Sequence, residues 1–240
     1  MVVDFHSHIL PMVDDGSSSV GESLDMLRLS KAQGIREIIL TPHFYPQSST
    51  PERFLEKRAR ALRLLREQLD PNEKLPMLRT GAEVYFYPHM SHSEELEQLR
   101  IEGTNCLLVE MPMGQWTDRI YRELEDIHGN LGLTPVVAHV DRYLGRFRDH
   151  GIPECLAQLP VLVQANASFF LNRCSSGKAL RMLRNGQIHV LGSDCHNMKQ
   201  RKPNLGPALE RINRKLGRSA IDWIHENERL ILQGNKEGML

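Results

Sequence analysis

The sequence has no excess of charge of either sign. Its 240 residues contain 30 Lys and Arg and 30 Asp and Glu, so the formal net charge is zero. This balance argues against a protein that binds nucleic acid or a membrane surface mainly by electrostatic attraction. No apolar run approaches the roughly 20 residues that a membrane-spanning helix needs. The first residues, Met-Val-Val-Asp-Phe-His, lack a basic stretch, so no secretory signal peptide is expected.

Cysteine is also scarce and is not arranged in pairs. The four cysteines lie at positions 106, 155, 174 and 195 and form no Cys-x-x-Cys motif. This spacing provides neither a zinc ribbon nor a disulfide framework, and it suits the reducing cytoplasm. Low-complexity tracts, repeats of fixed period and obvious linkers are missing as well. We therefore expect a single domain over residues 1–240.

What the sequence does contain is an alternation of short apolar runs with longer amphipathic stretches. The apolar runs suit buried strands and cover Val2–Phe5, Ile35–Leu40, Met77–Ala82, Cys106–Val109, Thr134–Ala138, Val161–Val163 and His189–Leu191. Helical patterns cover Ser19–Gln33, Pro51–Leu69, Asp118–Leu131, Ser175–Asn185, Pro203–Leu216 and Ala220–Leu232, the last of them with a possible interruption. Pro51 and Pro203 suit first-turn positions. The alternation predicts an α/β protein with a closed or nearly closed (β/α) barrel; a doubly wound open sheet is the alternative.

The most informative number is the 11 histidines, because five of them follow predicted strands. Six of the seven predicted strands end at His, Asp or Glu: His6, His8, Asp14 and Asp15; His43; Glu83; Glu110; His139 with Asp141 and Arg142; and Asp194 with His196. The carboxyl ends of barrel strands converge on one mouth, where active sites lie. Eight or nine ligands there would suffice for two or three metal ions.

Each of these residues also has a simpler interpretation. A single histidine at a strand end can serve packing alone, and we assign that role to His128, His150, His189 and His225. His89 and His92 are expected to be solvated in a loop. Asp14 and Asp15 could form a turn with Gly16 and cap the following helix. Glu83 and Glu110 are harder to explain in this way, because a carboxylate that closes an apolar run is costly unless paired or metal-bound.

The ordered set of motifs resembles a known superfamily. It comprises His6-Ser-His8, Asp14-Asp15-Gly16, Thr41-Pro42-His43, Gly81-Ala82-Glu83, Glu110-Met-Pro112, Ala138-His139 and Ser193-Asp194-Cys-His196-Asn197. Together these motifs resemble the PHP (polymerase and histidinol phosphatase) superfamily. The stretch from Asp4 to Pro11, followed by Asp-Asp-Gly, is similar to the bacterial PHP-type protein-tyrosine phosphatases of capsule and exopolysaccharide operons, the CpsB/YwqE type.

The resemblance implies a distorted (β/α)7 TIM-like barrel that binds three metal ions, usually manganese. The metal ligands that it implies are His6, His8, Asp15, His43, Glu83, Glu110, His139, Asp194 and His196. It also matches Arg142 and Arg201 to arginines near the phosphate. From the residues alone, Arg142 could equally be a solvated residue at a helix start, and Arg201 could belong to a surface charge run.

The function that the resemblance implies is hydrolysis of phosphotyrosine in the cytoplasm by a metal-activated hydroxide. Its substrate would be the C-terminal tail of a membrane-anchored bacterial tyrosine kinase. The mixed His and carboxylate ligands fit manganese, iron or zinc better than calcium or magnesium. One hypothesis lets Glu110 bridge two metal ions, because a carboxylate can span them. The rim at Phe44–Ser49 or the pair Phe169-Phe170 could contact a tyrosyl ring, and the oligomeric state stays open.

Four other readings compete with this one. Cys195 and Arg201 have the Cys-x5-Arg spacing of thiol-based tyrosine phosphatases, but the five residues between them include no glycine to form a phosphate-cradling loop. A small-molecule phosphatase, for example one acting on histidinol phosphate, would use the same ligands. A nuclease or polymerase-associated module is disfavoured by the zero net charge. A non-catalytic module that binds a kinase tail would not need an open polynuclear site.

Overall fold

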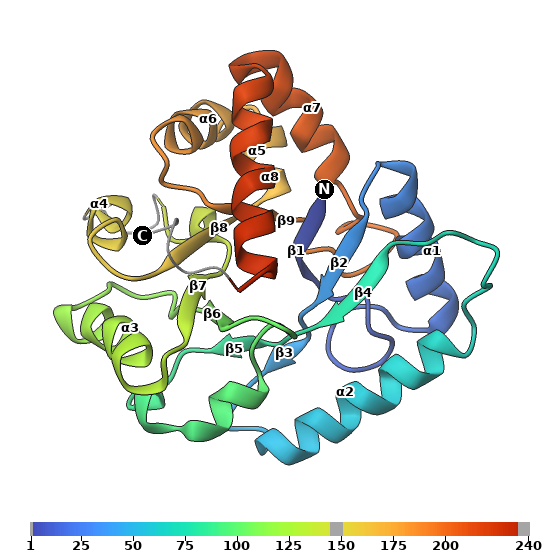
Figure 1. Cartoon of the computed structure of the whole chain (residues 1–240), viewed down its shortest axis with the longest axis horizontal. Coiled ribbons are helices and arrows are strands. Elements are labelled where there is room, and N and C mark those ends of the chain that lie inside the picture. The colour runs from blue at the N-terminus through green and yellow to red at the C-terminus, as the bar shows by residue number, and fades with distance from the viewer. Residues whose placement is uncertain (1, 145–150, 235–240) are drawn as a thin grey trace.

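We analysed a computed structural model, which describes residues 2–144 and 151–234. Nine strands alternate with helices along the described chain (Figure 1). The strands are β1 (Val3–Ser7), β2 (Glu37–Leu40), β3 (His43–Phe44), β4 (Met77–Thr80), β5 (Glu83–Tyr85), β6 (Cys106–Glu110), β7 (Thr134–Val137), β8 (Leu162–Asn166) and β9 (Val190–Gly192). All of their pairings are parallel, as expected where helices make the crossovers.

The helices surround these strands, as Figure 1 shows. The α-helices are α1 (Val20–Ala32), α2 (Pro51–Arg66), α3 (Asp118–Leu131), α4 (Ile152–Leu156), α5 (Ala167–Leu171), α6 (Ser176–Arg184), α7 (Leu205–Leu216) and α8 (Arg218–Leu232). Three short 3₁₀ turns are η1 (Met90–His92), η2 (Glu94–Gln98) and η3 (Val140–Arg142). Helix α2 begins with Pro51 in its first turn, and the side chain of Thr50 accepts a hydrogen bond from Arg53 N.

The strands form one distorted barrel, in which two of the barrel strands are interrupted. The hydrogen-bonded order is β1-β2-β4 in one sheet and β3-β5-β6-β7-β8-β9 in the other. Thr41-Pro42 separates β2 from β3, and Gly81-Ala82 separates β4 from β5. Each of these pairs therefore forms one interrupted barrel strand. Pro42 cannot donate to a strand ladder, which accounts for a break at that point. When each interrupted pair is counted as one strand, the barrel has seven strands.

The ring closes where β9 meets β1. Asp194 N donates to His6 O at 2.8 Å, and His8 N donates to Cys195 O at 2.9 Å. This approach requires Gly192, because a Cβ added there would lie 2.4 Å from Cβ of His6. The same close approach brings Asp194 and His196 beside His6 and His8, which lie nearly 190 residues away in the sequence.

The hydrophobic core has an inner and an outer layer. The inner cluster joins residues of strands around the ring, which can meet only inside the barrel: Val3, Phe5, Ile39, Leu108, Val136, Ala138, Leu162 and Val190. Ile231 of α8 belongs to it, and α8 lies across the barrel on the side of the N-terminus (Figure 1). The larger outer cluster packs the strands against the helices. The inner layer therefore fills one end of the barrel, and the polar site occupies the other.

The distorted (β/α)7 barrel expected from the sequence is confirmed, and the open-sheet alternative is wrong. Two of the predicted helices need correction. Pro203 lies outside α7, which begins at Leu205, and α8 runs without interruption. The short elements η1, η2, η3, α4 and α5 were not predicted, because segments this short carry too little periodicity.

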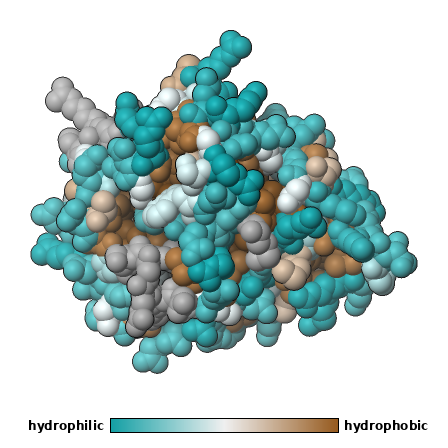
Figure 2. Space-filling model, turned by 45° about the horizontal axis from the view of Figure 1, so that its top comes forward, coloured by the Kyte–Doolittle hydropathy of each residue, from teal (hydrophilic) through white to brown (hydrophobic). Residues whose placement is uncertain are grey.

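The surface is mainly polar, because the core contains most of the apolar side chains. On the face shown in Figure 2, hydrophilic residues predominate and hydrophobic ones form small separate areas. Across residues 2–144 and 151–234, no helix has both the length and the apolar character required to cross a membrane.

Candidate metal centre

The predicted ligands gather at the carboxyl ends of the barrel strands. His6 lies in β1, Glu83 begins β5 and Glu110 ends β6. His139 and Asp194 lie two residues after the ends of β7 and β9, and both have left-handed backbones, with φ of 32° and 51°. Such conformations are costly for residues other than glycine and are found at functional sites that the surrounding structure enforces. All nine predicted ligands take part in one connected cluster.

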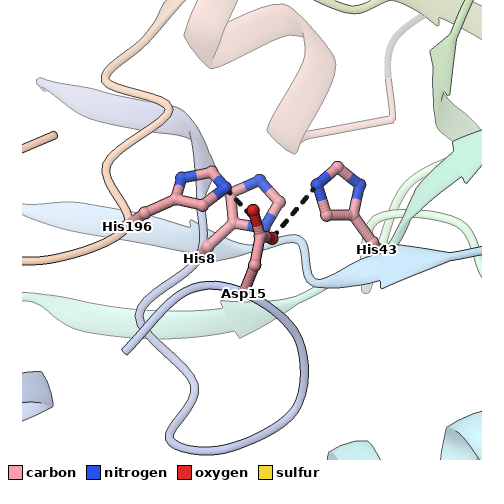
Figure 3. A group of neighbouring side chains, drawn as sticks. All are labelled: His8, Asp15, His43 and His196. Atoms are coloured by element: carbon pink, nitrogen blue, oxygen red, sulfur yellow. Dashed lines mark ion pairs between the residues drawn. The ribbon is translucent and has the colours of Figure 1, made fainter. Parts of the chain in front are cut away.

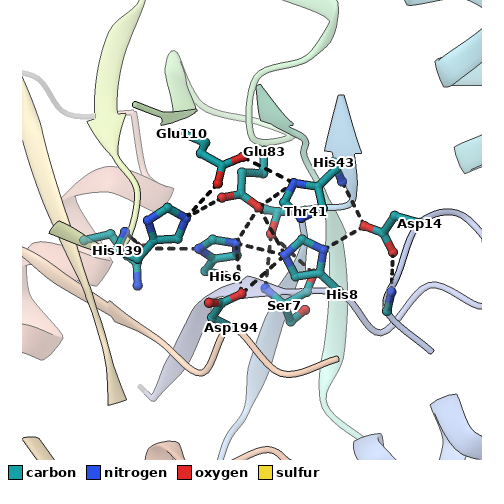
Figure 4. A network of polar contacts seen from close by, with 12 residues as sticks. His6, Ser7, His8, Asp14, Thr41, His43, Glu83, Glu110, His139 and Asp194 are labelled. Carbon is teal, nitrogen blue, oxygen red and sulfur yellow. Dashed lines mark hydrogen bonds and ion pairs between the residues drawn. The ribbon is translucent and has the colours of Figure 1, made fainter. Parts of the chain in front are cut away.

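Glu83 lies at the centre of this cluster (Figure 4). Its Oε2 is 3.1 Å from His6 Nε2, 3.2 Å from His8 Nε2 and 3.0 Å from His43 Nδ1. Its Oε1 is 2.7 Å from His139 Nε2. Burial alone would raise the pKa of Glu83, but the charge of His6 and the hydrogen bond of His139 hold it well below its usual range. A buried carboxylate among four imidazoles is suited to binding cations.

The imidazoles of His6 and His8 point their Nε2 atoms at each other, at a distance of 3.0 Å. Each ring is fixed by a partner at Nδ1, which is 3.1 Å from Gln164 Oε1 in His6 and 2.7 Å from Asp14 Oδ2 in His8. Because both partners are acceptors, each Nδ1 donates, and each Nε2 is left as an acceptor whenever the imidazole is neutral, as it must be to bind a metal ion. Two facing acceptors are stabilised by a shared cation. This is the arrangement by which outer partners orient metal-binding histidines.

Asp14 holds the loop that follows β1 against the cluster. Besides His8, its carboxylate accepts hydrogen bonds from His43 N at 2.9 Å and from Gly16 N at 3.0 Å. A Cβ at position 16 would lie 2.3 Å from the carbonyl oxygen of His8, so only glycine fits there. Burial would lower the pKa of His8, but Asp14 and Glu83 raise it to about 10. Asp14 therefore forms the turn suggested by the sequence and also orients a candidate ligand.

Asp15 points toward the imidazoles of His43 and His196 (Figure 3). Its Oδ1 is 3.6 Å from His43 Nε2 and 3.5 Å from His196 Nε2. Its side chain is 68% exposed, whereas those of both histidines are largely buried. Asp15 is thus the solvent-facing member of the cluster, as expected of a ligand at the mouth of a barrel.

Two arginines converge on Asp194. Arg142 Nη2 is 2.5 Å from its Oδ2, and Arg201 Nη2 is 2.7 Å from its Oδ1. Asn166 Nδ2 also donates to Oδ2 of Asp194, at 2.9 Å. Arg142 Nη1 lies 3.5 Å from Glu110 Oε1. The solvated-residue interpretation of Arg142 is therefore wrong, and that of Arg201 holds only in part, because its guanidinium is partly exposed at the edge of the site.

Glu110 borders the cluster beside His43 and His139. Its Oε2 is 3.7 Å from His43 Nδ1 and its Oε1 is 3.7 Å from His139 Nε2, so it contacts the histidines less closely than Glu83 does. Burial, together with the charge of Glu83, raises the pKa of Glu110 to about 7. The bridging role predicted for Glu110 stays a prediction, and the geometry gives Glu83 the more central position.

The residues present fit divalent metal ions. Three groups bring their ligand atoms within 4.8 Å of one another: His8, Asp15, His43 and His196; His6, His8 and Asp194; and His43, Glu83 and Glu110. Four buried atoms of the cluster, His43 Nδ1, Glu83 Oε2, Asp194 Oδ1 and His196 Nε2, make no contact with hydrogen-bond geometry among the described residues, although a charged group lies within 4.0 Å of each. Buried polar atoms without partners are costly unless they bind an ion. Imidazoles mixed with carboxylates suit transition metals.

Two other predictions about the site are decided by burial. Phe169 and Phe170 are 6% and 0% exposed in the hydrophobic core, so they cannot contact a substrate ring. Tyr45, in the predicted rim, is 38% exposed, and its ring stacks on His43 with centroids 5.0 Å apart.

Cys195 is completely buried, and burial raises the pKa of its thiol well above the usual value. The thiol-based mechanism is therefore excluded.

The structure agrees with most of the roles assigned to the other histidines. His89 and His92 are exposed, although His89 Nε2 lies 2.9 Å from Arg119. His128, His189 and His225 are partly buried outside the cluster. His150 lies outside the described residues.

Sequence reasoning missed Gln164, whose Oε1 also accepts a hydrogen bond from His139 N at 2.6 Å. An amide within the apolar strand Leu162–Asn166 was the available signal.

Comparison with known proteins identifies the family of the chain. The sequence pattern of the family described as "Capsular polysaccharide synthesis, CpsB/CapC" matches residues 2–233. The chain belongs to the CpsB/CapC family. Two relatives in that family are the tyrosine-protein phosphatases CpsB of Streptococcus pneumoniae and YwqE of Bacillus subtilis, each 30% identical to this chain. The alignment covers 96% of this chain and 98% of CpsB, and 97% of this chain and 92% of YwqE.

The CpsB/CapC fold is also found among solved structures. A structure from the work on YwqE of Bacillus subtilis and CpsB of Streptococcus pneumoniae, described there as metal-dependent tyrosine phosphatases, superposes with a TM-score of 0.83. The sequence identity is 23%, and the match covers 98% of this chain and 96% of that one. This likeness shows that the barrel is shared over its whole length.

Proposed function

We propose that this chain is a metal-dependent protein-tyrosine phosphatase, a hydrolase of phosphotyrosine monoesters. The observation that carries the proposal is the cluster of five histidines and four carboxylates at the barrel mouth, bordered by Arg142 and Arg201. The named activities of the CpsB and YwqE relatives support it. We propose that the chain acts as one domain in the cytoplasm, on a bacterial tyrosine kinase that regulates capsule or exopolysaccharide synthesis.

The residues that would hold the metal ions are His6, His8, Asp15, His43, Glu83, Glu110, His139, Asp194 and His196. Divalent ions bound there, two or three of them, would neutralise phosphoryl oxygens and lower the pKa of water toward neutrality. We favour manganese over iron or zinc, because carboxylates supply four of the nine proposed ligands and carboxylate oxygen suits manganese.

The protein itself would bind and orient the phosphate. Arg142 and Arg201 carry planar guanidinium groups that can each bind two phosphoryl oxygens. Asp194 holds both arginines in place and is itself held by Asn166, so little movement is needed when a phosphate arrives. Tyr45 offers an aromatic face at the edge of the site on which a tyrosyl ring can lie. A phenolate leaves readily, so a strong general acid is not required.

The test is hydrolysis of phosphotyrosine after chelation and after manganese is added back. We expect activity on p-nitrophenyl phosphate and on a phosphotyrosine peptide to disappear with chelation and to return with manganese. Activity that survives thorough chelation would refute the metal mechanism. Histidinol phosphate and single-stranded DNA serve as comparison substrates, and preferential turnover of either would replace the tyrosine phosphatase assignment.

The proposed natural substrate is the phosphorylated C-terminal tail of a membrane-anchored bacterial tyrosine kinase. A flexible tail can reach a site at the open mouth of a barrel. The test is dephosphorylation of the intact kinase compared with a kinase that lacks its tail tyrosines. Equal turnover of an unrelated phosphotyrosine protein would argue against this partner.

A further inference from the structure

A pocket of about 690 Å³ adjoins the metal centre and continues along helix α2. Its inner end is lined by Asp15 and His43, which belong to the centre, and by Tyr45. Its outer end is lined by Arg53, Lys57 and Arg60 of α2. The pocket is within the range of ligand sites, which is roughly 300–1,000 Å³. It is therefore large enough to take more of a substrate than one phosphate group.

The charges of the outer end are arranged on one face of α2. Arg53, Lys57 and Arg60 are spaced by four and three residues, so their side chains share a helix face. The only acidic residue of α2 that lines the pocket among the described residues is Glu56. The two arginines are exposed, and no ion pair involves either of them in the part of the chain that the structure describes. Lys57 Nζ donates to Val13 O at 2.6 Å, which fixes its charge at the pocket wall.

The pocket therefore changes in electrostatic character along its length. The inner end carries the carboxylates of Asp14 and Asp15 beside the metal centre, and the outer end carries three cations against the single carboxylate of Glu56. Phe44 and Phe54 are buried beneath it, with ring centroids 5.3 Å apart, so its floor is rigid and apolar. A peptide that places its phosphotyrosine at the inner end would lay neighbouring residues against α2.

We propose that this pocket is a specificity subsite for an acidic side chain, Asp or Glu, that flanks the phosphotyrosine of a peptide substrate. Arg53 and Arg60 provide the charge-assisted hydrogen bonds to its carboxylate. Tyr45 separates the tyrosyl ring from the flanking residues. The inference rests on the proposed phosphatase function and deepens it, because it names the class of peptide that the same site prefers.

The experiment compares two phosphotyrosine peptides that differ only in flanking Glu or Gln residues, two to five positions on either side. With the manganese-loaded enzyme, we expect KM to be about threefold to tenfold lower for the Glu peptide, with similar kcat. The difference should shrink as salt is raised, because the pairs are exposed. In the double variant Arg53→Gln, Arg60→Gln, KM for the Glu peptide should rise to that of the Gln peptide.

A matched control lies on the same helix. Arg63 and Arg66 are exposed in α2 but do not line the pocket, so Arg63→Gln, Arg66→Gln removes the same charge without touching the subsite. This control should keep the preference for the Glu peptide. If both double variants lost the preference for the Glu peptide equally, the preference would depend only on net charge, and the proposal would be overturned. Glutamine is a good helix former, so both variants should fold, which circular dichroism checks.

Binding provides a readout that is independent of turnover. Fluorescence anisotropy with non-hydrolysable phosphonate versions of the two peptides should show the same difference in Kd. Equal KM and Kd for the two peptides, with both hydrolysed, would refute the subsite and leave the phosphatase function standing. Hydrolysis of neither peptide would refute the phosphatase function itself. A peptide with a second phosphotyrosine serves as a third arm, and preference for it without preference for Glu would also refute the carboxylate subsite.

Discussion

Asp14 accepts a hydrogen bond from Nδ1 of His8 at 2.7 Å, and this contact decides which nitrogen of His8 faces the metal centre. With Nδ1 held by Asp14, Nε2 is directed at His6 and Glu83, and in the neutral imidazole it is the nitrogen that can bind a metal ion. The same carboxylate also binds the backbone of His43. Asp14 thus orients two candidate ligands, although it is not among the nine predicted ones.

We expect the substitution Asp14→Asn to weaken metal binding by about 10-fold to 100-fold, the usual cost of losing a partner that orients a histidine ligand. Manganese affinity, measured by competition with a chelator, tests this directly. Excess manganese should restore most of the activity, because the ligands themselves remain. The control Asp126→Asn removes an exposed carboxylate from α3. An unchanged affinity in Asp14→Asn would mean that His8 is oriented by its packing alone.

Glu83 should be the carboxylate on which the centre depends most. It contacts four imidazoles, whereas Glu110 contacts two at longer distances. We expect Glu83→Gln to reduce both bound metal, measured by mass spectrometry, and kcat by at least about 100-fold. Glu110→Gln should retain more metal than Glu83→Gln. The reverse order would give the central role to Glu110 and restore the bridging hypothesis made from the sequence.

Arg142 should act on the phosphate and not on the metal. Its guanidinium lies beside Asp194 and Glu110, within reach of a phosphoryl group at the centre. We expect Arg142→Lys to lower kcat/KM for a phosphotyrosine peptide by about 10²–10³-fold, because lysine cannot reproduce bidentate binding of the transition state. Metal content should stay the same. A parallel loss of metal would show that Arg142 serves mainly to hold Asp194.

Cys195 should be dispensable for catalysis despite its spacing from Arg201. The side chain is completely buried, and the thiol does not ionise near neutral pH because burial raises its pKa. We expect Cys195→Ser to keep more than about half of the wild-type kcat, with a modest loss of stability from placing a hydroxyl in the core. Cys174→Ser, at an exposed cysteine, is the control. Complete inactivation of a folded Cys195→Ser protein would bring back the thiol mechanism.

The fold could be predicted from the sequence because strands and helices alternate regularly and each strand is short and apolar. The break at Gly81 was less predictable, because Gly81 lies inside the apolar run Met77–Ala82. The strand that follows Pro42 was not predicted, because His43–Phe44 is too short to carry a pattern of its own. The ligand set followed from the ends of the strands, but its internal geometry did not. Whether Glu83 or Glu110 is central depends on how β5 and β6 pack, and this is a tertiary property.

Partners of the ligands were harder to recognise than the ligands themselves. Gln164 and Asp14 orient His6 and His8 across the barrel and across a loop, and neither contact has a fixed spacing in sequence. The subsite on α2 depends on the position of a helix face relative to the mouth. Likewise, the pair Phe169-Phe170 was open to two interpretations until burial placed it in the core.

A final prediction concerns stability, at the end of the barrel opposite to the metal centre. Glu228 of α8 is buried there, and burial raises the pKa of its carboxyl from 4.5 to about 9, with Asp4 and Glu37 adding to the shift. Between these two pH values, the folded protein keeps a proton that the unfolded chain has lost. The contribution of Glu228 to stability is therefore complete below about pH 4.5 and is lost as pH rises toward 9.

Glu228→Gln should remove this dependence, because glutamine cannot ionise and its amide oxygen can still accept the hydrogen bond from the backbone of Val3. We expect the variant to gain in unfolding free energy relative to the wild type as pH rises from 5 to 9, by up to about 1.4 kcal/mol per pH unit. Urea unfolding followed by circular dichroism across this range measures the difference. Glu210→Gln, at an exposed position of α7, is the control and should leave the slope unchanged. Parallel curves for Glu228→Gln and the wild type would mean that Glu228 is ionised in the folded protein, and that its charge is balanced by groups that solvate this end of the barrel.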